Sequence, residues 1–311
     1  FPYAPLSSQQ QTTNILTFSP PGGGKSVLIS TLISAAVFDP VLQGLPKIAA
    51  IDIGNSSKGV VNMLRAIAPP ELKERFMHVE FELTERFGIN VMDTRLGCPY
   101  PTSVERGFLT NFLTMILTPI GSQEPIQDAS SIASTLIKEL YTVCAEDQQT
   151  KYVRGQDHRV TEWLSNQRDF EVKPTTTWWQ VVYFAMQKKA YDIAGLAQRF
   201  AVPNLRMLPA QLVRSETLKN LYKTDGDGVD EILLHAKRLL MGFLDQYPSL
   251  CKPSNFDFQE TDVCIIDLNK VTQDTGVEGE RRTTIAYLVS RYLLGKDFLT
   301  NKDILNEMPP I

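Results

Sequence analysis

One short stretch, from Ser19 to Ser26, carries the residues with the most distinctive chemistry. It reads Ser-Pro-Pro-Gly-Gly-Gly-Lys-Ser and matches the end of the P-loop (Walker A) pattern G-x-x-x-x-G-K-[ST], with Ser19 in place of the first glycine. Consecutive glycines let backbone amides approach an anion closely, and the N-terminus of a helix adds its dipole. The expected nucleotide-binding residues are Gly22, Gly23, Gly24, Lys25, Ser26 and Val27.

Within this stretch, two side chains have separate expected roles. Lys25 is expected to act in catalysis by reaching the β- and γ-phosphates of ATP, and the Ser26 hydroxyl is expected to bind Mg²⁺. The alternative is a glycine-rich turn that precedes a helix by chance. An apolar run before the glycines and helical spacing after them favour the phosphate site.

Acidic residues at the ends of apolar runs are the next candidates. A P-loop ATPase needs such a carboxylate to hold the metal through water, and most need a glutamate to polarise the attacking water. Asp52 and Asp267 each end an apolar run and are the candidate catalytic carboxylates. Ile53 and Leu268 follow them, so neither forms an Asp-Glu pair. The alternative for each aspartate is a structural role as a strand-end cap.

The elements around these residues alternate between strand and helix. Apolar runs predict strands at 14–18, 47–53 and 261–267, and alternation of apolar with polar residues predicts a strand at 77–83. Helical spacing of apolar residues predicts helices at 25–38, 57–67, 102–118, 127–145, 178–200, 230–246 and 280–294. A loop is expected at 1–11 and a turn at 224–228. This order predicts an α/β fold with a parallel sheet.

The distribution of helices predicts three parts. We expect a P-loop α/β core over 1–145, a mostly helical insertion over 146–255, and a return to the α/β core over 256–311. The chain has 311 residues, which is enough for a large domain with an insertion.

Composition excludes several classes of protein. With 43% hydrophobic and 21% charged residues, the chain is neither wholly disordered nor a fibre. A net charge of −4 argues against a general binder of DNA or anionic lipid. The four cysteines lack CxxC spacing and are expected to be reduced thiols, and a zinc site is not expected. The longest apolar stretch, 27–38, is too short to span a bilayer.

Two further pairs of residues have competing interpretations. Arg281 and Arg282 are either arginines that act on a neighbouring subunit's nucleotide or, as we prefer, a solvated pair balanced by nearby glutamates. Trp178 and Trp179 could stack on a nucleic-acid base, but their helical setting favours core packing.

The order of these features resembles the energising ATPases of type IV secretion and conjugation systems, the VirB/TraC class. The similar segments are Ile51-Asp-Ile-Gly-Asn-Ser56, Phe87-Gly-Ile-Asn90 and the Phe- and Leu-rich run at 108–113. The loop form and the stretch from Asn90 to Gly97 are most similar to the type IVB, Dot/Icm-like branch represented by DotO (IcmB) and the plasmid-borne TraU. The resemblance covers nearly the whole chain, with its specific motifs in residues 15–120.

The resemblance implies a RecA-like P-loop core that uses ATP and Mg²⁺. Hydrolysis would power transfer of a protein or nucleoprotein substrate by a bacterial type IV secretion system. A ring-shaped homo-oligomer such as a hexamer, contacts with other secretion subunits, and a place in the bacterial cytoplasm at the inner membrane are also implied. In this layout the Walker B Asp-Glu pair is expected downstream of Ile311.

Two other functions remain open from the sequence. One is a DNA-pumping translocase similar to FtsK and HerA, against which the acidic pI and the lack of basic clusters count. The other is a nucleotide-gated docking scaffold with little turnover, which the missing Asp-Glu pair supports.

Overall fold

The computed structural model describes residues 16–20, 22–39, 44–54, 56–84, 86–146, 150–223, 231–255 and 261–298. The loop expected at 1–11 and the turn expected at 224–228 lie outside these ranges. Within them the chain has a mixed α/β fold, with eleven α-helices and one three-stranded parallel sheet.

The α/β part combines two segments that lie far apart in the sequence. Its elements are α2 (Lys25–Val37), β1 (Ile48–Asp52), α3 (Ser56–Ile67), η1 (Pro70–Arg75), β2 (Phe76–Glu80), β3 (Val263–Asp267) and α12 (Gly276–Phe298). The strand order is β1-β3-β2, so β3 lies between the two earlier strands and pairs in parallel with both. The predicted strands at 47–53, 77–83 and 261–267 are therefore confirmed within a few residues.

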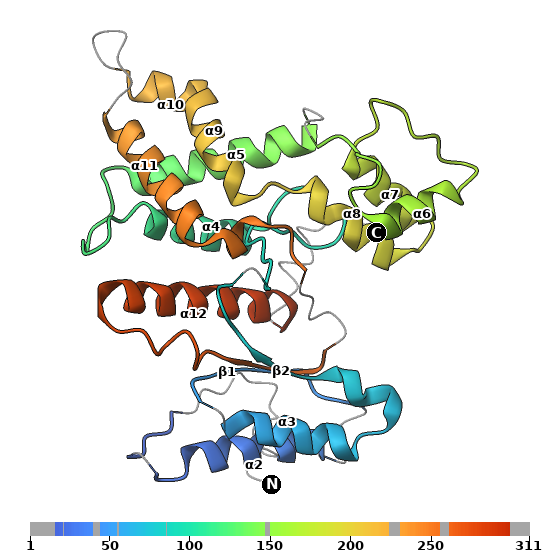
Figure 1. Cartoon of the computed structure of the whole chain (residues 1–311), viewed down its shortest axis with the longest axis vertical. Coiled ribbons are helices and arrows are strands. Elements are labelled where there is room, and N and C mark those ends of the chain that lie inside the picture. The colour runs from blue at the N-terminus through green and yellow to red at the C-terminus, as the bar shows by residue number, and fades with distance from the viewer. Residues whose placement is uncertain are drawn as a thin grey trace.

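Helices cover both faces of this sheet, as Figure 1 shows: α2 and α3 lie on one side and α12 lies on the other. Every residue of β3 is buried. Val263 and Ile265 pack on the side of α3, whereas Cys264 and Ile266 belong to the core that includes α12. Because successive strand residues face opposite sides, a strand covered on both faces reads as an uninterrupted apolar run.

The helical part lies beyond α12, which separates it from the sheet (Figure 1). Its elements are α4 (Ser103–Ile116), α5 (Ala129–Glu146), α6 (His158–Ser165), α7 (Trp178–Gln187), α8 (Tyr191–Ala201), η2 (Leu205–Met207), α9 (Leu208–Arg214), α10 (Glu216–Leu221), α11 (Glu231–Gln246) and η3 (Pro248–Cys251). Helices α4, α5, α9 and α11 share one core with α12, and α6 to α8 form a second. Thus α4 and α5 pack with helices that follow residue 146.

Local sequence explains where two of these helices begin. The Thr102 hydroxyl accepts a hydrogen bond from the amide of Glu105, and the Glu105 carboxylate accepts one from the amide of Thr102. Thr177 and Gln180 form the same reciprocal capping box at the start of α7. Each box satisfies amides that a helix N-terminus leaves without partners.

Two expected elements differ from the structure. The strand expected at 14–18 is absent from residues 16–18, where Leu16 is 84% and Phe18 is 88% exposed; Asn14 and Ile15 lie outside the described residues. Apolar composition indicates a strand because it anticipates burial, and these side chains have none. The helix expected at 178–200 is two helices, because Lys189 adopts a φ of 59° and breaks the first one.

Several side chains are buried as the sequence analysis expected. Trp178 and Trp179 are 2% and 5% exposed in the second core, which confirms their packing role. The four cysteines are free and buried. Across the part of the chain that the structure describes, no helix is both long and apolar enough to cross a membrane.

Candidate functional site

The glycine stretch forms a tight loop directly before α2. Gly22 and Gly24 have φ values of 78° and 86°, in the left-handed region that other residues rarely adopt. A Cβ atom on Gly23 would lie 1.9 Å from the Ser19 hydroxyl oxygen and 3.0 Å from the Pro20 carbonyl oxygen, so a side chain there would force the Ser19 hydroxyl to rotate away. The Gly23 amide donates to the Pro20 carbonyl at 3.0 Å and closes the turn. The backbone conformation therefore favours glycine at positions 22 and 24, and glycine at position 23 leaves the Ser19 side chain undisturbed. Pro21 lies outside the described residues.

Helix α2 begins at Lys25 with Gly24 as its N-cap. Its first helical hydrogen bond runs from the Leu28 amide to the Gly24 carbonyl at 2.9 Å, so the amides of Lys25, Ser26 and Val27 lie outside the helical ladder. The first turn carries no acidic residue that would repel an anion. This end of the helix can therefore present amide donors and a positive dipole to a phosphate group.

The side chains of this first turn face solvent. The Lys25 ammonium folds back over the loop and donates to the Ser19 carbonyl at 2.5 Å. Ser26 is exposed, and Val27 is 69% exposed. Lys25 and Ser26 are thus accessible to a ligand, and an anionic ligand would compete with the Ser19 carbonyl for the ammonium group.

The two candidate aspartates meet at the carboxyl edge of the sheet. Parallel register pairs Asp52 with Asp267 across β1 and β3. Asp267 is buried, and its carboxylate accepts hydrogen bonds from the amides of Asn269 at 2.8 Å and Gly54 at 3.4 Å. Asp267 therefore holds the turns that follow two strands, which is the capping geometry considered for it above.

A third carboxylate at this edge was missed from the sequence. Glu80 ends β2 in register with Asp267. It binds the ammonium groups of Lys58 at 2.7 Å and Lys270 at 3.2 Å, and these hydrogen bonds lower the pKa of Glu80 to about 2. Glu80 could have been recognised as the last residue of a strand, as the two aspartates were. The strand expected at 77–83 continued past Glu80, so its position at the end of a strand was not apparent.

The glycine loop and the acidic edge belong to neighbouring elements. Helix α2 packs against α3, and α3 packs against β2 and β3. The loop contributes amides, one ammonium group and one hydroxyl, while the edge contributes three carboxylates in a row. Amides with an ammonium group suit phosphates, and the Ser26 hydroxyl offers an oxygen ligand of the kind that Mg²⁺ prefers. Among the described residues, no group of three or more acidic, histidine or cysteine side chains is placed to hold a metal ion by itself.

Arg281 has a different role from both interpretations given above. Its guanidinium donates to the carbonyls of Thr118 at 2.8 Å, Ile116 at 3.3 Å and Met115 at 3.5 Å, at the end of α4. Helix C-termini leave carbonyls without internal partners, and a cation there also favours the helix dipole. Arg281 therefore ties α12 to α4, while Arg282 pairs with Asp274.

Comparison with known proteins adds no assignment to this geometry, because no family model, no curated protein and no solved structure matches the chain.

Proposed function

We propose that the chain binds ATP with Mg²⁺ through residues 22–27 and is the nucleotide-binding part of a P-loop ATPase with a RecA-like core. The observation that carries this proposal is the loop of three glycines, two of them in the left-handed region, directly before the α2 N-terminus and its free amides. Such a loop lets the backbone approach an anionic ligand closely.

Each residue of the proposed site has a distinct role. The amides of Gly24 to Val27 bind the phosphates, Gly22 and Gly23 shape the loop around them, Lys25 neutralises their charge, and the Ser26 hydroxyl binds Mg²⁺. Asp52 and Asp267 assist the metal through water from the edge of the sheet. Bound Mg²⁺ would supply charge neutralisation at the transferred phosphoryl group.

The biological role that we propose rests on the sequence resemblance. ATP hydrolysis would energise substrate transfer by a bacterial type IV secretion system of the Dot/Icm-like branch. The chain would act in a ring-shaped homo-oligomer, with other secretion subunits, at the cytoplasmic side of the inner membrane. Loss of the γ-phosphate would alter the contacts that hold mobile segments and so produce movement.

One observation favours a second candidate, a nucleotide-gated docking scaffold. Ile53 and Leu268 follow the two strand-end aspartates, and the Asp267 carboxylate is already engaged by two amides. Fast hydrolysis needs a positioned base for water. We therefore expect this chain to bind ATP but to release phosphate at a rate close to background, which a steady-state phosphate assay measures.

Calorimetric titration with Mg-ATP tests the binding site. The wild-type chain should bind saturably, and Lys25→Ala should weaken binding by roughly 10- to 100-fold, the worth of a charged hydrogen bond. Ser26→Ala should weaken binding in Mg²⁺ but have little effect when Mg²⁺ is chelated. Lys138→Ala, an exposed lysine on α5, is the matched control. Equal affinities of wild type and Lys25→Ala would refute the proposed site.

A further inference from the structure

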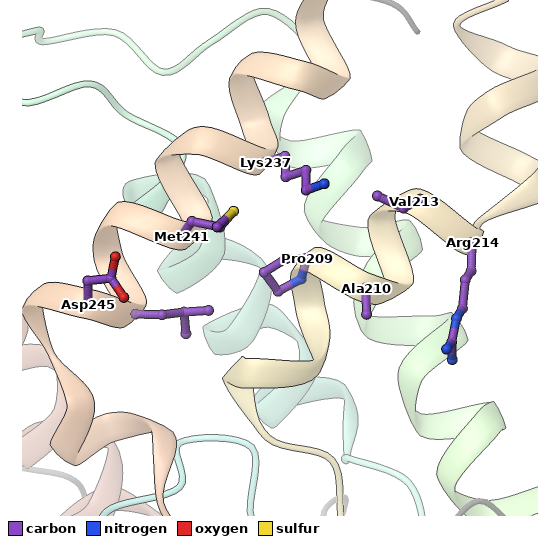
Figure 2. A pocket seen from close by; sticks show the side chains of 8 residues that line it. Pro209, Ala210, Val213, Arg214, Lys237, Met241 and Asp245 are labelled. Carbon is purple, nitrogen blue, oxygen red and sulfur yellow. The ribbon is translucent and has the colours of Figure 1, made fainter.

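A hollow of about 500 Å³ lies on the helical part, between α9 and α11. Figure 2 shows Lys237 and Met241 extending from α11 toward α9, with Pro209 opposite Met241. The hollow is lined by Pro209, Ala210, Val213, Arg214, Lys237, Met241, Leu244 and Asp245. Most of its wall is therefore apolar, although it is open to solvent.

Two apolar residues of this groove, Val213 and Met241, lie outside the core beneath them, whereas Leu244 packs against that core. Helix α11 already buries Leu233, Ala236, Leu240 and Phe243 on its inner face. On the outer face Met241 is 49% exposed, and on α9 Val213 is 51% exposed. A hollow lined by exposed apolar side chains from two adjacent helices is typical of a surface that another molecule covers.

The charges of the groove are unequal along its length. Arg214 and Lys237 contribute two cations, and Asp245 contributes one anion at the opposite end of the α11 segment. Arg238 lies three residues before Met241 and is exposed. Among the described residues, no ion pair engages Arg214, Lys237 or Arg238. The unpaired cations complement carboxylates rather than lysines on a binding partner.

We propose that the groove between α9 and α11 binds an amphipathic helix of a partner protein, with apolar residues facing Val213 and Met241 and carboxylates facing Arg214 and Lys237. Two packed helices create a groove into which the side-chain ridge of a third can fit. Apolar anchors at helical spacing would supply affinity, and the cations would select acidic sequences. This inference concerns partner docking and is independent of the proposed nucleotide site.

Fluorescence anisotropy with a designed probe tests this inference on the whole 311-residue chain. The probe is a fluorescein-labelled peptide of roughly 18 residues, with leucines on one helical face and glutamates elsewhere. We expect saturable binding that weakens about tenfold or more with Met241→Glu. The double variant Arg214→Glu/Lys237→Glu should also weaken binding and remove its dependence on salt.

Matched controls separate this outcome from general stickiness. A peptide with lysine in place of every glutamate should bind at least about tenfold more weakly. Val153→Glu changes a similarly exposed apolar residue outside the groove and should leave binding intact. Circular dichroism melting should show that every variant remains folded.

Several results would overturn the inference. Equal binding of the acidic and basic peptides would show that Arg214 and Lys237 do not select an acidic partner. Equal loss from Val153→Glu and Met241→Glu, or the absence of saturable binding, would remove the groove itself. Sedimentation that reveals a dimer dissolved by Met241→Glu would assign the surface to a second copy of the chain instead.

Discussion

Helix α2, which follows the glycine loop, buries one residue, Ile33, whereas the shorter helix α7 of the helical part buries five. Val27 on α2 is 69% exposed, while Trp178 on α7 is 2% exposed. The helix proposed to bind phosphate is therefore weakly held by packing, and the helix far from it is firmly held. Ligand-binding segments are commonly drawn from the less stable parts of a protein, because they must adapt when the ligand binds.

The largest change in the free energy of unfolding is expected for substitution of Trp178. Replacing this buried ring with alanine leaves a cavity and should lower the free energy of unfolding by about 3–5 kcal/mol. Val27→Ala on α2 should change it by less than about 0.5 kcal/mol, since the side chain is already in water. Urea unfolding of both variants measures the difference. Similar losses for the two variants would contradict the contrast between the two helices.

The joint between the two parts gives a smaller effect. Arg281→Ala removes the donor to the carbonyls of Met115, Ile116 and Thr118, and should lower the free energy of unfolding by about 1.5–3 kcal/mol. Arg282→Ala is the neighbouring control, because its exposed pair with Asp274 should contribute at most about 1 kcal/mol. Thermal melting would contradict this account if Arg282→Ala proved the more damaging change.

The sheet edge predicts the smallest effect, a dependence of stability on acidity. The pKa of Glu80 is about 2, below its ordinary value of 4.5, because Lys58 and Lys270 favour the charged carboxylate. The stabilisation is therefore complete above pH 4.5 and is lost as the pH falls toward about 2. Glu80→Gln should flatten the melting temperature over that range, and 1 M salt should reduce the difference from wild type. Parallel curves for the two proteins would contradict this assignment.

Much of the layered core could be predicted from the sequence. Uninterrupted apolar runs located β1 and β3; β3 has no polar side because it is buried on both faces, whereas β1 is a partly exposed edge strand. Helical spacing located α2, α3, α4, α5, α11 and α12. Helices α6, α9 and α10 were not predicted, because they have eight residues or fewer and periodicity needs a longer window.

The remaining differences have physical causes that the sequence does not display. The break at Lys189 has no glycine or proline to mark it, and α7 and α8 pack against each other across it. The role of Arg281 depends on carbonyls at and just after the end of α4. One of them belongs to Thr118, which precedes Arg281 by 163 residues in the sequence. The three glycines and Lys25 were recognisable because their function depends on local backbone geometry. The place of Glu80 beside Asp267 follows only from the register of β2 with β3, which the sequence does not specify.

Hydrogen–deuterium exchange with and without Mg-ATP tests the central claim, that the glycine loop and the start of α2 bind the nucleotide phosphates. Amides stabilised by a ligand exchange more slowly. We predict slower exchange at residues 22–28 in the presence of Mg-ATP, no change in α5 and α7, and, at a Mg-ATP concentration near the wild-type Kd, much weaker protection in Lys25→Ala. Unchanged exchange at residues 22–28 under saturating Mg-ATP, or equal protection of wild type and Lys25→Ala at that lower concentration, would contradict the account.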